Sequence, residues 1–109
     1  MALDVASLAS SMLAAAKGSV TTGWTTLQPF AQTQFMNIAQ QIVDIETQLA
    51  TGSITQAEAT LLLDMQKNAS RAALLSVEGI ALLTAQNAIN AALGAVATAV
   101  NGALGFAFL

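Results

Sequence analysis

The stretch Phe30–Glu58, FAQTQFMNIAQQIVDIETQLATGSITQAE, decides the fold that the sequence predicts. Its large apolar side chains recur at alternating spacings of three and four residues, so an α-helix would place them on one side. They are Phe35, Ile38, Ile42, Ile45 and Leu49. Polar side chains fill the opposite side: Gln34, Asn37, Gln41, Asp44 and Gln48. This pattern predicts an amphipathic helix over residues 30–50, with Pro29 at its first turn, where proline is favoured.

The end of the same stretch predicts a sharp turn between two helices. Gly52 can adopt the left-handed backbone conformation that ends a helix. Thr55 and Glu58 have the spacing of a capping box, in which each side chain accepts a hydrogen bond from the backbone of the other residue. Because short connections of this kind join antiparallel helices, we expect Gly52, Thr55 and Glu58 to form the turn of a helical hairpin.

After this turn the helical pattern continues from residue 55 to residue 101 with no proline to break it. A helix of about 46 residues would be about 69 Å long, roughly twice the length of the helix over 30–50. Charged side chains fall on one stripe of its first half: Asp64, Lys67, Arg71 and Glu78. We expect this stripe to be a solvated face with local ion pairs.

The residues before this hairpin predict one more helix and a connection. Residues 3–17 have apolar side chains at helical spacing, and Gly18 would end the helix after them. Residues 19–28 are poor in helix formers and are predicted to be a linker. The N-terminal run is apolar, as in a secretion signal, but Asp4 stands where a signal needs Lys or Arg. An amphipathic helix is therefore favoured there, and the sequence indicates no cellular location.

These patterns predict a single all-α domain over residues 1–109. Its expected architecture is an elongated hairpin, made of the middle helix and the long C-terminal helix, with a short N-terminal helix and an apolar tail to residue 109.

The C-terminal segment, residues 79–109, contains no ionisable side chain. Small residues recur through it at spacings of four and three, which would let another helix approach closely. They are Ala81, Ala85, Ala88, Ala92, Ala95, Ala99 and Gly102. The segment ends with Phe106, Phe108 and Leu109. Because the middle helix is too short to cover this segment, we expect all ten residues to form an assembly interface between copies of the chain.

Composition excludes several function classes. Charged residues make up only 8% of the chain, against about 25% in typical domains. The chain has no His and no Cys, so it lacks imidazole catalysis, thiolate nucleophiles and the usual zinc ligands. Its basic residues are Lys17, Lys67 and Arg71, too few for a nucleic-acid-binding patch. We expect no enzymatic activity, no cofactor, no metal and no small-molecule substrate.

The leading hypothesis is a structural subunit that assembles with itself into a ring, tube, filament or shell, for example in a virion or a secretion machine. The alternative is a membrane-inserting protein of the pore-forming, lysis or anchor type, with residues 79–109 as the membrane segment. Ala91–Leu109 has 19 residues, close to the roughly 20 that span a bilayer, but no Lys or Arg flanks it. A soluble helical adaptor is the third possibility.

Overall fold

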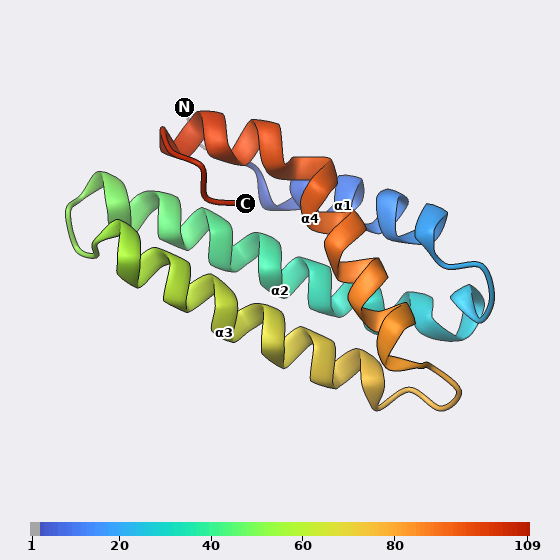
Figure 1. Cartoon of the computed structure of the whole chain (residues 1–109). Coiled ribbons are helices and arrows are strands. Elements are labelled where there is room, and N and C mark those ends of the chain that lie inside the picture. The colour runs from blue at the N-terminus through green and yellow to red at the C-terminus, as the bar shows by residue number, and fades with distance from the viewer. Residues whose placement is uncertain (1–2) are drawn as a thin grey trace.

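The computed structural model describes residues 3–109. Met1 and Ala2, which begin the segment weighed as a secretion signal, lie outside the described residues. The described residues form four helices and no strand (Figure 1): α1 Val5–Ser19, α2 Trp24–Ala50, α3 Gln56–Leu75 and α4 Leu82–Leu104. The predicted all-α class is confirmed, whereas the predicted three-helix arrangement is replaced by four helices.

Helix α1 corresponds to the helix predicted over residues 3–17, but Gly18, predicted to end it, lies inside it. Its N-cap is Asp4, whose Oδ2 accepts a hydrogen bond of 2.8 Å from the Ser7 N–H. The buried side of α1 carries Leu8, Ala9, Met12 and Ala16. This side packs on α2 and α4, so α1 belongs to the core rather than standing apart from the hairpin.

Helix α2 begins at Trp24, so the predicted linker over 19–28 is wrong in its second half. Only residues 20–23 connect α1 to α2. The physical reason is burial: Leu27 is fully buried, and its packing holds weak helix formers in helical conformation. Pro29 consequently lies inside the helix, where it lacks the N–H that would bond to the Thr25 carbonyl.

Helices α2 and α3 form an antiparallel hairpin (Figure 1). Gly52 has a φ of 73°, in the left-handed region. Thr55 caps α3: its hydroxyl accepts from the Glu58 N–H at 3.1 Å, and its own N–H donates to Glu58 Oε1 at 2.9 Å. The turn is therefore closed by its own local hydrogen bonds.

The prediction of one continuous helix over residues 55–101 is wrong, because one helix ends at Leu75 and the next begins at Leu82. Gly79, inside the break, has a φ of 85°, a conformation that interrupts a right-handed helix and suits glycine. Val77 is buried and anchors the turn in the core. A straight helix would leave the apolar face of its second half bare, whereas the reversal buries that face within the same chain.

Helix α4 returns across the molecule and packs mainly on α1, with smaller contacts to α3 and α2 (Figure 1). Its buried side carries Ala85, Ala88, Ile89, Ala92, Leu93, Val96 and Val100. The accessible surface of the molecule is 5768 Å², against about 5,700 Å² expected of a compact monomer of this mass. The expectation that the chain is too short to cover its own C-terminal helix is therefore wrong.

The C-terminal tail folds back onto the end of α4. The backbone N–H groups of Phe108 and Leu109 both donate to Asn101 Oδ1, at 2.9 and 2.8 Å. Phe106 and Phe108 pack edge to face with ring centroids 5.6 Å apart. These contacts hold Phe108 in the core, where it is buried.

Candidate functional site

The predicted assembly residues are divided by the fold. Ala85, Ala88 and Ala92 are completely inaccessible, and Phe108 is nearly so. They belong to the buried apolar cluster of the chain, in which α4 packs mainly on α1. In the folded molecule these four residues are therefore not available to another copy.

The other predicted residues remain at least partly accessible. Phe106 and Leu109 are half-buried in the folded tail, and Ala81 is exposed at the start of α4. Ala95, Ala99 and Gly102 are exposed together on the second half of α4. We call these last three residues the α4 patch. It is the part of the predicted small-residue surface that still faces outward.

A second uncharged surface runs along the outer side of α3. Leu61 and Met65 are each 60% exposed and Leu75 is 37% exposed. Asn68 and Ala72 are exposed between them. We call these five residues the α3 stripe. It follows the helical repeat for about 21 Å and lies opposite the side that α3 buries.

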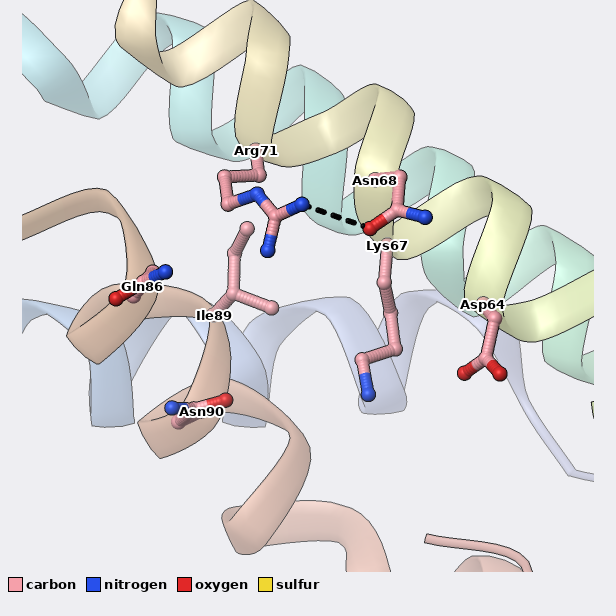
Figure 2. A pocket seen from close by; sticks show the side chains of 7 residues that line it. All are labelled: Asp64, Lys67, Asn68, Arg71, Gln86, Ile89 and Asn90. Carbon is pink, nitrogen blue, oxygen red and sulfur yellow. Dashed lines mark hydrogen bonds between the residues drawn. The ribbon is translucent and has the colours of Figure 1, made fainter. Parts of the chain in front are cut away.

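A trough separates α3 from α4. Its polar end is a hollow of about 200 Å³ lined by the residues in Figure 2: Asp64, Lys67, Asn68, Arg71, Gln86, Ile89 and Asn90. Its apolar end is a hollow of about 340 Å³ lined mainly by Leu63, Leu93, Gly94, Ala97, Phe108 and Leu109. Asp64, Lys67 and Asn90 line both hollows, so the two ends form one continuous depression.

The charges predicted as a solvated stripe of α3 lie along this trough. Arg71 Nη2 donates to Asn68 Oδ1 at 2.9 Å, so the guanidinium bonds to an amide rather than to a carboxylate. Figure 2 shows Lys67 and Arg71 extending from α3 into the space between α3 and α4, with the Arg71 guanidinium turned toward Asn68. Both cationic side chains are half-buried. Glu78 stands apart, exposed in the turn that precedes α4.

Sequence reasoning missed both the trough and the α3 stripe. The stripe had a signal, since Leu61, Met65 and Leu75 have helical spacing on a side that does not include Leu63 and Leu74. The trough had none, because it exists only where the reversal at 76–81 brings α4 beside α3.

The described part of the chain contains no cluster of three or more carboxylates placed to hold a metal ion. Within residues 3–109, no helix has both the length and the hydropathy needed to cross a membrane. Comparison with protein-family models, curated proteins and solved structures finds no match to this chain.

Proposed function

We propose that the chain is a non-enzymatic structural subunit that associates with copies of itself, and that the α3 stripe is its principal contact. The sequence favours this class of protein, but the surface proposed for the contact is now on α3 rather than on the C-terminal segment. The alanines of α4 that the sequence predicted as the contact are buried, whereas Leu61 and Met65 of the α3 stripe are exposed to solvent in the folded monomer.

The observation that carries this proposal is the exposure of Leu61 and Met65, one helical turn apart. No charged residue lies between Leu61 and Leu75 on this stripe, because Asp64, Lys67 and Arg71 point to the trough side of α3. Uncharged apolar surface of this kind marks contact sites more often than solvated faces.

The spacing of the stripe suits a second copy of α3 running antiparallel. From Leu61 to Leu75 the steps are four, three, four and three residues, so the stripe reads nearly the same in both directions about Asn68. A two-fold contact centred on Asn68 would set Leu61 against Leu75 of the second copy and Met65 near its Ala72. Steps of three and four residues are those of closely aligned helix pairs.

The α4 patch supports a second, different contact. The second half of α4 lines the trough beside α3 with Leu93, Gly94 and Ala97, whereas the α4 patch consists of other, exposed residues of that half. Two separate contacts let copies join in series, which a single two-fold contact cannot do. This arrangement supports an extended or closed assembly rather than a simple dimer.

The test measures mass against concentration by sedimentation velocity and light scattering in detergent-free buffer. The wild type is expected to form larger species as concentration rises from micromolar to submillimolar. The double variant Leu61→Gln, Met65→Gln is expected to remain monomeric, because burying a Leu-sized side chain gains roughly 1.5–3 kcal/mol and each side chain counts twice in a symmetric contact.

The matched control is Phe30→Gln, Met36→Gln, which removes apolar side chains that are 49% and 44% exposed on α2. This control is expected to associate like the wild type. The proposal is wrong if the wild type stays monomeric throughout, or if the control abolishes association as fully as the α3 double variant. A protein that is monomeric in buffer and floats with liposomes would instead support the membrane alternative.

A further inference from the structure

The distribution of positive charge singles out the trough between α3 and α4. The chain has three basic residues, and two of them, Lys67 and Arg71, line its polar end. They are one helical turn apart on α3, and both are half-buried. Cationic groups that are partly shielded from water attract an anion more strongly than fully solvated ones.

The hydrogen-bond donors at this end are largely free. Among the seven side chains in Figure 2, the one hydrogen bond runs from Arg71 to Asn68. The Lys67 ammonium and the amides of Gln86 and Asn90 make none with one another. A carboxylate, which only accepts hydrogen bonds, can take several of these N–H donors at once.

The other end of the trough is apolar and has room. Leu63, Leu93 and Phe108 form its buried wall, and Gly94 leaves a gap where a side chain would stand. A Cβ built on Gly94 meets no atom within 4 Å. An aliphatic tail lying here would cover carbon surface that water now touches.

We propose that this trough binds a small amphipathic carboxylate, with its head group at Lys67 and Arg71 and its aliphatic tail over Gly94 toward Phe108. A few convergent polar groups beside an apolar hollow are typical of small-ligand sites. The site shares Asn68 with the α3 stripe, but its cationic and apolar contacts lie on the trough side of α3.

One group opposes this ligand. Asp64 lines both ends of the trough and is exposed beside Lys67. Its negative charge repels a carboxylate and competes with it for the Lys67 ammonium. The variant Asp64→Asn is therefore expected to bind the carboxylate more tightly than the wild type, which a merely hydrophobic site would not do.

The experiment titrates the full chain with decanoate, below the concentration at which it forms micelles, and measures heat of binding and thermal shift. Decanol supplies the same tail without charge, and decyltrimethylammonium supplies it with the opposite charge. Decanoate is expected to bind one molecule per chain and the other two more weakly. Binding of decanol or of the ammonium as tight as that of decanoate, or no binding of decanoate, would overturn the proposal.

Two variants locate the site. Arg71→Gln keeps the helix and removes one charge, and about three- to tenfold weaker decanoate binding is expected from loss of a partly shielded charged hydrogen bond. Gly94→Leu places a side chain at the apolar end, where its Cβ meets no atom within 4 Å, and replaces a poor helix former, so the protein is expected to stay folded while decanoate binding is lost.

The matched control is Gly18→Leu, which adds the same side chain to open space on α1, away from the trough. It is expected to bind decanoate like the wild type. Unchanged binding in Arg71→Gln or Gly94→Leu, or equal loss in Gly18→Leu, would show that decanoate binds elsewhere and would refute the assignment.

Discussion

Two polar side chains fasten the two ends of the described chain. Asp4 caps α1 through the Ser7 N–H, and Asn101 accepts both N–H groups of the folded tail. The role of Asp4 leaves a local signal in the sequence, since an Asp one residue before a helix is a favoured N-cap, although the helix predicted over residues 3–17 included Asp4. The role of Asn101 does not, since its partners Phe108 and Leu109 approach only after the tail has turned back.

The cap at Asp4 makes stability depend on pH in the acid range. Hydrogen bonds from the Ser7 side chain and backbone lower the pKa of the Asp4 carboxyl, despite its full exposure. A lowered folded-state pKa means that this stabilisation is complete above the ordinary aspartate pKa of about 3.9 and is lost as pH falls through the folded value.

The variant Asp4→Asn separates the cap from the charge, because asparagine still offers an oxygen to the Ser7 N–H. At neutral pH the wild type is expected to melt slightly higher than Asp4→Asn, and the difference should shrink to zero as the pH falls toward 2. Thermal melts of both proteins across this pH range measure it. A difference that does not vary with pH would contradict the expectation.

At the scale of the element, the hairpin was predictable and the break after it was not. The apolar spacing along α2 and the capping box of Thr55 and Glu58 are local patterns that can be recognised over a few residues. The segment 76–81 has no proline and is flanked by helical patterns on both sides. Its reversal depends on the gain from burying α4 against α1, which no local window contains.

Substitution of Gly79 tests what the break requires. A Cβ at this position meets open space, but an L-residue at a φ of 85° is strained, so Gly79→Ala is expected to destabilise the fold by roughly 1–2 kcal/mol. The control Gly18→Ala also adds its methyl group to open space, within helix α1, and should stabilise by roughly 0.5–1 kcal/mol. Urea unfolding midpoints that move in the same direction would contradict this account.

Helix α4 makes a second contrast within one element. Ala92 is completely buried, so Ala92→Leu is expected to destabilise the monomer by about 1–3 kcal/mol through overpacking. Ala95, three residues later, is exposed, and Ala95→Leu should leave the free energy of unfolding within about 0.5 kcal/mol of wild type. Chemical denaturation of the monomers measures both values. Equal effects would mean that Ala92 and Ala95 do not differ in burial as described.

At the scale of the whole molecule, the reversal at 76–81 converts an expected rod into a compact body. The Cα trace measures 42 × 21 × 19 Å, with a radius of gyration of 13.6 Å, close to the roughly 13 Å expected of a compact domain of this size. A continuous helix over 55–101 would alone reach about 69 Å. The all-α class survived this change because it depends on composition and periodicity rather than on the path of the chain.

Small-angle X-ray scattering distinguishes the two shapes. Extrapolated to zero concentration, it is expected to give a longest dimension near the 42 Å of the Cα trace plus a margin for side chains and hydration. A value approaching 70 Å from a monodisperse monomer would instead favour the unbroken helix.

Eight of the 24 apolar side chains buried in the described part of the chain are alanines, and five of these belong to α1 and α4, the two helices that pack most extensively on each other. An alanine has a single methyl group to lose, so every substitution there except glycine adds volume. Such a core resists enlargement, because a larger side chain at these positions overpacks it. Substitutions on the outer faces of the molecule are therefore expected to be accepted far more readily than any larger residue at the buried alanine positions of α1 and α4.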